Sequence, residues 1–383
     1  MKIGVETKAH TSIACLTPPG SAALATLALY GPDAWRIVRT SFQPRGKGQL
    51  PEQSFPGKFW LGKLGAGPGD EVVVALKQLE PVPYIEIHCH GGREVLKYLH
   101  EHLVEQGAAP ASWEEMIAKT EGDPSRARAL IELAQAPTVR TASIILEQYQ
   151  GAFDRALAQV RAALERKDGE EVRCQLKELM RHANLGRHLT RPWRVVLAGA
   201  PNVGKSSLAN RLAGYLRSVV DSTPGTTRDL VTTRLALDGW PVELSDTAGV
   251  RHTKEELEGQ GVALALSAAA EADLCLWLLD GSAEPIWPDS RPANLHLAIN
   301  KVDLPPAWNY AEAGEALRVS AVTGVGIEEL CAAVSAWLVP DAPLPGTAVP
   351  FTPEICDRLE ELLSSLNAES PGAIAQKIKT FWD

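Results

Sequence analysis

The spacing of apolar positions divides the chain into three stretches of different character. Over residues 12 to about 107, short apolar runs alternate with turn-rich segments, which predicts a small α/β domain. Over residues 126–189, apolar positions recur at helical spacing, so helices should dominate there. Beyond Pro192, strand-length apolar runs alternate with helical segments, which predicts crossover units and a mainly parallel sheet.

The expected strands are short and apolar. They cover residues 22–29, 72–76 and 84–87 in the first stretch, and 195–197, 242–244, 274–279, 295–299 and 317–319 in the third. A proline-rich connector over 339–353 leads to a last helix, expected over 354–366. That helix could pack back onto the earlier helices, which would make the helical domain discontinuous in sequence.

Length and composition agree with a folded protein of several domains. The 383 residues suffice for two or three domains, and 45% hydrophobic with 22% charged residues is typical of soluble globular chains. No apolar window approaches the length of a membrane span and the amino terminus lacks a secretory signal, so we expect a cytoplasmic protein with no membrane partner. The six cysteines form no Cys-x-x-Cys pair, so neither a disulfide framework nor a zinc ribbon is indicated.

The net charge limits how much of the protein surface could bind nucleic acid. A formal charge of -9 argues against an electrostatic footprint spread over the whole protein, although it leaves room for a local basic patch. The cations of one such patch are Arg173, Lys177, Arg181, His182, Arg187, His188 and Arg191. The first three recur at helical spacing, and the patch fits a solvated helix face better than an RNA contact.

The segment 199–206, GAPNVGKS, has the sequence and the context of a P-loop. It follows the expected strand 195–197 and opens a helical run over 207–212. Its glycines let the backbone N–H groups point at phosphate oxygens, and Lys205 supplies positive charge near the β- and γ-phosphates. The hydroxyl of Ser206 should reach a magnesium ion.

Two further motifs follow expected strands and indicate guanine nucleotide. In the segment 246–249, DTAG, Asp246 can hold magnesium through water, and the N–H of Gly249 can turn toward the γ-phosphate. In the segment 300–303, NKVD, the carboxylate of Asp303 can accept two hydrogen bonds from guanine, whereas adenine offers no such pair of donors. The predicted nucleotide-binding residues are Asn202, Val203, Gly204, Lys205, Ser206, Ser207, Thr226, Thr227, Asp246, Thr247, Ala248, Gly249, Asn300, Lys301, Asp303, Ser320 and Ala321, the last two contacting the base carbonyl through backbone N–H groups.

A threonine-rich segment and an acidic segment complete the catalytic candidates. In 223–229, TPGTTRD, the hydroxyl of Thr227 is our choice for a second magnesium ligand, and ordering of this segment around the γ-phosphate would make a conformational switch. The residue after the DTAG motif, Val250, cannot hydrogen-bond water. Glu255, Glu256 and Glu258 remain as groups that could orient the attacking water, and physical reasoning alone does not choose among them.

The run GRHLTRPWRVVLAGAPNVGKSSLANRLAG over 186–214, together with TPGTTRD, DTAGVR and LEGQG, closely resembles the tRNA-modification GTPase family called MnmE or TrmE. The resemblance implies that Glu258 is the catalytic residue, because a family glutamate occupies the matching position. It also implies activation by potassium. The ion would be coordinated by Asn202, with Thr226 and the backbone of Asp221 and Thr223 as its other contacts, and would offset charge in the transition state.

The amino-terminal part resembles the folate-binding, dimer-forming domain of the same family at 17–20, 30–32 and 86–92. Ala28 replaces a family arginine, and 81–83 replaces a Gly-Glu-Asp stretch, which argues against binding of a folate derivative. The family further implies a homodimer, an FAD-dependent tRNA-modification partner protein, and tRNA as a partner.

The prediction is an α/β protein with three parts: an N-terminal α/β domain (1–118), a discontinuous helical domain (119–190 plus 341–383), and a P-loop GTPase domain of mainly parallel sheet (191–340) inserted in the helical one. GTP is the expected substrate, with Mg²⁺ and K⁺ as cofactors. Two functions stay open. The chain either serves wobble-uridine modification in tRNA, or is a diverged regulatory GTPase switch without that activity, because it ends in KIKTFWD where the family has a Cys-x-Gly-Lys element.

Overall fold

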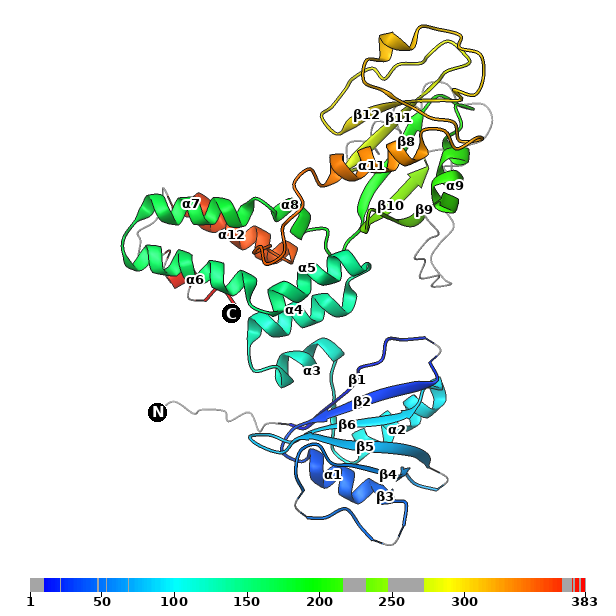
Figure 1. The fold of residues 1–383 in the computed structure, drawn as a ribbon. Helices are drawn as coiled ribbons and strands as arrows, with labels where there is room; N and C mark the ends of the chain where they lie inside the picture. The colour runs from blue at the N-terminus through cyan, green and yellow to red at the C-terminus, as the bar shows by residue number, and fades with distance from the viewer. Residues whose placement is uncertain are drawn as a thin grey trace. The chain divides into compact units, whose positions relative to one another are not determined.

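The computed structural model describes residues 10–20, 22–46, 48–52, 54–67, 69–215, 232–246, 272–366, 374, 376–378 and 380–382 (Figure 1). The chain divides into two units, residues 1–131 and 132–383. No helix among the described residues is both long and apolar enough to cross a membrane. All six cysteines are free thiols.

The first unit is built on a seven-stranded sheet with the order β3-β4-β5-β6-β2-β1-β7. Its strands are β1 (Ser12–Cys15), β2 (Leu24–Tyr30), β3 (Phe42–Pro44), β4 (Phe59–Leu64), β5 (Asp70–Gln78), β6 (Tyr84–His90) and β7 (Ala109–Pro110). Every pairing is antiparallel except that of β1 with β7. Three of these strands, β2, β5 and β6, lie where apolar runs predict strands.

Three helices accompany this sheet: α1 (Ala34–Ser41), α2 (Arg93–Glu105) and α3 (Trp113–Thr120). Alternate residues of β5, such as Val72 and Val74, share one core with Ile37 of α1 and Leu99 of α2. A smaller apolar cluster of Ala14, Ala28 and Met116 joins α3 to β1 and β2. Along β5 the buried Val72, Val74 and Leu76 alternate with the half-buried Val73 and Ala75, as expected of a sheet with this core on one face.

Helix α4 (Pro124–Gln135) spans the boundary between the two units. The second unit continues with α5 (Val139–Tyr149), α6 (Ala152–Glu165), α7 (Gly169–Met180) and α8 (Ala183–Gly186), and it returns to helix after the second sheet with α12 (Pro353–Ser365). Helix α12 lies beside α7 (Figure 1), and its Cys356 thiol donates to the Ala183 carbonyl at 3.3 Å. Arg187 reaches Asp357 at 2.7 Å and Glu360 at 2.8 Å.

These ion pairs bear on the basic patch around α7 and α8. Besides the pairs of Arg187, Arg181 bonds Asp341 at 2.6 Å, so both guanidinium groups have carboxylate partners within the chain. His182 is buried, and burial lowers its pKa. These contacts favour a solvated, ion-paired surface over an RNA contact.

Within the part of the chain that the structure describes, the second sheet has six strands in the order β13-β12-β11-β8-β10-β9. They are β8 (Trp193–Gly199), β9 (Thr232–Leu237), β10 (Trp240–Asp246), β11 (Leu274–Asp280), β12 (Leu295–Asn300) and β13 (Leu317–Arg318), accompanied by α9 (Lys205–Tyr215), α11 (Ile327–Leu338) and the short 3₁₀ helix η2 (Tyr310–Ala313). All pairings are parallel except that of β9 with β10. The continuous apolar run of β11, buried over 274–279, is typical of a parallel sheet covered on both faces. The predicted α/β fold with a mainly parallel sheet is therefore confirmed.

The β9–β10 hairpin is tied to the helical part of this unit. Its turn, Asp238-Gly239, has φ values of 47° and 78°. Thr138, which caps α5, donates its hydroxyl to the Gly239 carbonyl at 2.6 Å, and Arg140 donates to the Asp238 carbonyl at 2.6 Å. The Arg140 guanidinium also lies 4.2 Å from the centre of the Trp240 ring. The turn between two strands of the sheet is thus held by the first turn of α5.

Candidate nucleotide-binding site

The P-loop lies between β8 and α9, and its shape depends on two glycines. Gly199 and Gly204 have φ values of 130° and 98°, a region that side-chain-bearing residues rarely adopt. A Cβ atom on Gly199 would lie 2.5 Å from the Leu278 carbonyl oxygen, and one on Gly204 would collide with the amide nitrogen of Asn300. The backbone therefore turns from the strand end into α9 without room for side chains, which leaves the first N–H groups of the helix facing a potential anion.

Lys205 begins α9 and is almost fully buried, with 9% of its surface exposed. Its ammonium group donates to the carbonyls of Gly199 and Ala200, both at 3.0 Å, so it lies over the curled loop. Ser206 and Ser207 follow in the first helical turn and are exposed. Positive charge, helix N-terminus and hydroxyls thus meet at one end of the sheet.

Asn300 joins the P-loop to the loop around Ala321 and is the first residue of the predicted guanine-recognition segment 300–303. It ends β12 and is 2% exposed. Its amide nitrogen donates to the Val203 carbonyl at 2.8 Å, and its amide oxygen accepts the Ala321 N–H at 3.1 Å. Three segments that are far apart in the sequence, around 203, 300 and 321, are therefore held by one side chain.

The neighbouring residues of the predicted base site are also placed by hydrogen bonds. The Ser320 N–H donates to the Val325 carbonyl at 2.9 Å, and the Ser320 hydroxyl accepts the Thr323 N–H at 3.0 Å. Asp303 is exposed at the same edge. With the Ser320 and Ala321 N–H groups engaged within the protein, their contact with the base carbonyl stays a prediction.

Lys301 forms an ion pair that sequence reasoning did not foresee. Its ammonium group lies 2.6 Å from the carboxylate of Asp280, the last residue of β11. Burial opposes ionisation of Asp280, but hydrogen bonds from Lys301 and Ser282 outweigh that effect and lower the pKa of the carboxyl. Arg211 of α9 was also missed. Its guanidinium bonds the Ala321 carbonyl at 2.9 Å and the Val322 carbonyl.

The magnesium side of the site is described only in part. Asp246 ends β10 and pairs in register with Leu197, so the ends of β10 and β8 lie side by side. The predicted residues that lie outside the described part of the chain are Asp221, Thr223, Thr226, Thr227, Thr247, Ala248, Gly249 and Glu258.

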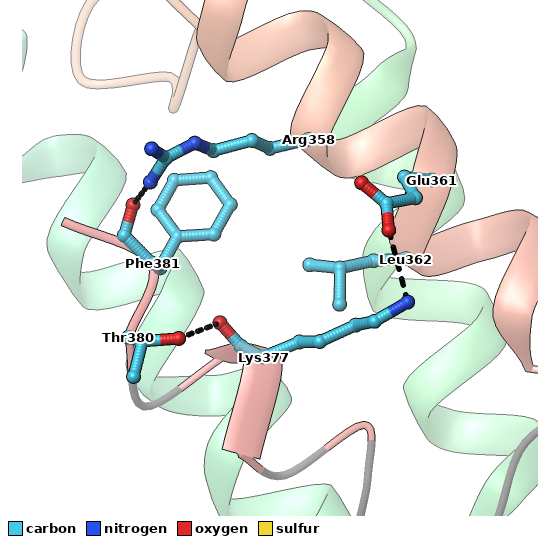
Figure 2. A pocket seen from close by; sticks show the side chains of 6 residues that line it. All are labelled: Arg358, Glu361, Leu362, Lys377, Thr380 and Phe381. Carbon is cyan, nitrogen blue, oxygen red and sulfur yellow. Dashed lines mark hydrogen bonds and ion pairs between the residues drawn. The ribbon is translucent and has the colours of Figure 1, made fainter. Parts of the chain in front are cut away.

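A separate pocket lies in the helical part, where α12 faces the end of the chain (Figure 2). It encloses about 170 Å³ and is lined by Arg358, Glu361, Leu362, Lys377, Thr380 and Phe381. Lys377 bonds Glu361 at 3.0 Å, and Arg358 donates to the Phe381 carbonyl. Both cations are therefore used to attach the last residues to α12, and the pocket is not part of the sheet-edge site.

Residues 194–304 match the protein family described as "50S ribosome-binding GTPase". This range contains the P-loop and the NKVD segment, and the match confirms the expected P-loop GTPase fold of this part.

Curated relatives cover most of the chain. A protein of Thermus thermophilus named "tRNA modification GTPase MnmE" is 33% identical over 84% of this chain and 81% of its own length. Proteins of the same name from Thermotoga maritima and a Synechococcus species are 31% and 33% identical, over 84% and 87% of this chain and 80% and 82% of their own lengths. Among solved structures, the G domains of FeoB from T. maritima and Methanococcus jannaschii are similar at 24% and 25% identity. Each covers 38% of this chain, and the chain covers 99% and 98% of them, with TM-scores of 0.29 and 0.30.

Proposed function

The chain belongs to the family of tRNA modification GTPases named MnmE and is a GTP-hydrolysing enzyme, and we propose that its hydrolysis of GTP serves the modification of wobble uridine in tRNA. The support is the length of the alignments, which run over most of this chain and most of each relative. The alternative, a regulatory switch without modification activity, gains no support from these relatives, since all three carry the tRNA-modification name.

One observation carries the placement of the nucleotide: the Asn300 side chain bonds both the P-loop at Val203 and the loop at Ala321. A nucleotide whose phosphates lie at the start of α9 would therefore present its base to the segment 300–303. In this arrangement Lys205 and the P-loop N–H groups bind the phosphates, and Asp303 accepts the two guanine donors.

Hydrolysis proceeds by attack of water on the γ-phosphate, with Glu258 orienting that water directly or through a second one. Glu258 is assigned from the family resemblance. Val250, which follows the DTAG motif, offers no hydrogen-bonding group for this task. The P-loop N–H groups and Lys205 stabilise the charge that develops on the phosphate oxygens.

The oxygen donors at this edge fit a magnesium ion. The Ser206 hydroxyl lies in the first turn of α9, and β10 brings Asp246 to the end of the neighbouring strand. Hydroxyl and carboxylate oxygens are the ligands that Mg²⁺ prefers, and Thr227 would supply another. When bound, the ion neutralises charge on the β- and γ-phosphates.

Potassium would be held by Asn202. This residue lies within the P-loop, has a φ of 61°, and is exposed, and an exposed amide oxygen is a ligand available to a cation. Thr226 and the backbone of Asp221 and Thr223 are assigned as its further ligands by the family resemblance. A monovalent cation there would offset charge developing between the phosphates.

The remaining assignments concern assembly and organisation. The protein acts in the cytoplasm as a homodimer, together with an FAD-dependent partner protein and tRNA. Its parts are the N-terminal α/β domain 1–118, the helical domain 119–190 plus 341–383, and the GTPase domain 191–340. We do not propose that a folate derivative binds to the N-terminal domain, because Ala28 and the segment 81–83 depart from the family pattern.

Two experiments test this proposal. GTP turnover by the purified full chain should be faster in potassium than in sodium, and Glu258→Ala should abolish it while the matched variant Glu255→Ala retains it. Equal rates in the two salts would remove the potassium assignment, and an active Glu258→Ala would remove the catalytic one. Wobble nucleosides in tRNA from a strain lacking the gene should lose their modification, and an unchanged nucleoside profile would eliminate the tRNA role.

A further inference from the structure

Asp280 lies on β11, the strand next to β12, and its side chain contacts Lys301 of the predicted guanine-recognition segment 300–303. It ends β11, where it pairs in register with Asn300 of β12. The ammonium group of the next residue, Lys301, lies 2.6 Å from its carboxylate, with side-chain exposures of 29% for the lysine and 16% for the aspartate. This pair is largely sheltered, so solvent screens it less than a surface ion pair.

The Asp280 carboxylate is fixed on its far side. Its other oxygen accepts the Ser282 N–H at 2.9 Å and the Ser282 hydroxyl at 2.7 Å. The backbone is held as well, because the Trp308 indole donates to the Asp280 carbonyl at 2.8 Å and the Tyr310 hydroxyl to the Gly281 carbonyl at 3.0 Å. These hydrogen bonds fix the orientation of the carboxylate, so its second oxygen accepts from Lys301 in a defined position.

Lys301 has a backbone conformation that needs such support. Its φ is 64°, in the left-handed region that favours glycine. It stands between Asn300, which is locked to the P-loop, and Asp303, which is exposed and has no hydrogen bond to the P-loop among the described contacts. The alignment of Asp303 with a base therefore depends on the path of the chain through Lys301.

We propose that Asp280 is a positioning residue for guanine recognition. Its ion pair with Lys301 holds the segment 300–303 in the conformation in which Asp303 accepts both the N1–H and the exocyclic amine of guanine. This inference rests on the proposed role of Asp303 and assigns part of the base specificity to a residue outside the motif. Hypoxanthine, which lacks the exocyclic amine, offers only the first of the two hydrogen bonds.

The test is Asp280→Asn in the full-length protein. Asparagine keeps the size of the side chain and an oxygen that can accept from Ser282, but it removes the charge that binds Lys301. Dissociation constants for GDP and IDP are measured by competition with a fluorescent GDP analogue. We expect GDP to bind about tenfold more weakly and IDP about threefold or less, so that the preference for GDP falls. Steady-state kinetics should show the same effect mainly in the KM for GTP and less in kcat, because among the described contacts the Asp280 carboxylate bonds Lys301 and Ser282 and no P-loop residue.

Asp289→Asn is the matched control, since Asp289 is an exposed aspartate of the same unit and the charge change is identical. Unchanged affinities in Asp280→Asn, or an equal loss for GDP and IDP, overturn the inference while leaving the GTPase assignment intact. A wild-type protein that binds neither nucleotide overturns both. Should Asp280→Asn fail to fold, Ser282→Ala replaces it: this variant keeps the carboxylate but removes one donor, and a smaller drop in the GDP preference supports the inference, whereas an unchanged preference refutes it.

Discussion

Replacing Asn300 by alanine removes the side chain that joins three segments of the nucleotide-binding edge. The variant loses the bond to the buried Val203 carbonyl and the bond from the half-buried Ala321 N–H. An unsatisfied buried carbonyl costs about 1 to 3 kcal/mol, and a lost bond to a partly hydrated N–H costs roughly 1 kcal/mol. The combined loss is about 2 to 4 kcal/mol, which corresponds to roughly 30- to 900-fold in an equilibrium constant.

Because the same bonds contribute to folding and to nucleotide binding, the loss divides between two measurable quantities. Titration with a fluorescent GDP analogue gives the change in binding free energy, and urea unfolding of the nucleotide-free protein gives the change in the free energy of unfolding. Asn210→Ala is the control, since Asn210 is exposed on α9. A combined loss below about 1 kcal/mol would refute the reasoning, because it would mean that the Asn300 bonds contribute no more than an ordinary exposed hydrogen bond.

Gly204→Ala places a Cβ against the Asn300 amide at a residue with a φ of 98°. The affinity for GDP, measured by the same titration, should therefore fall by about tenfold or more, and an unchanged affinity would show that the P-loop can change conformation to accept the side chain. Arg140→Ala removes the bond to the Asp238 carbonyl and should lower the free energy of unfolding by about 1 kcal/mol, with Arg140→Lys intermediate; equal stabilities in urea would contradict this. Burial opposes ionisation of Asp280 but hydrogen bonds donated to it lower its pKa, so its stabilising effect is present above the ordinary aspartate pKa of about 3.9 and is lost as the pH falls through the lowered value. The stability difference between wild type and Asp280→Asn should therefore be constant near neutrality and shrink in acid, and a difference that persists at the acid end would contradict the linkage.

The pattern of apolar runs in the sequence was enough to locate the parallel strands of the second sheet. A strand such as β11 is apolar throughout because helices and loops cover both of its faces, so it stands out against the polar segments around it. The edge strand β9 was not predicted. Its alternation of polar and apolar residues is short, and the signal that could have revealed it was the Asp238-Gly239 dipeptide, a pair typical of tight hairpin turns.

The sequence motifs predict the groups that contact the nucleotide, but they do not reveal the side chains that hold those groups in place. Arg211 supports the loop that follows β13 by bonding the carbonyls of Ala321 and Val322. A contact between a helix side chain and backbone carbonyls more than a hundred positions away leaves no local pattern, since any arginine on an exposed helix face looks the same. Only the packing of α9 against the sheet brings the two together.

Asp280 is a different case, because the rule that locates the motifs also points to it. In an open parallel sheet, the residues at the carboxyl ends of the strands gather at one edge, where ligands bind. Gly199, Asp246 and Asn300 end β8, β10 and β12, and Asp280 ends β11 between them. A charged residue at the end of an apolar strand of this sheet is therefore a candidate for contact with the nucleotide or with a neighbouring residue of the site. The 2.6 Å bond joins Asp280 to Lys301, a predicted nucleotide-binding residue, and the proposed positioning role of Asp280 rests on that bond.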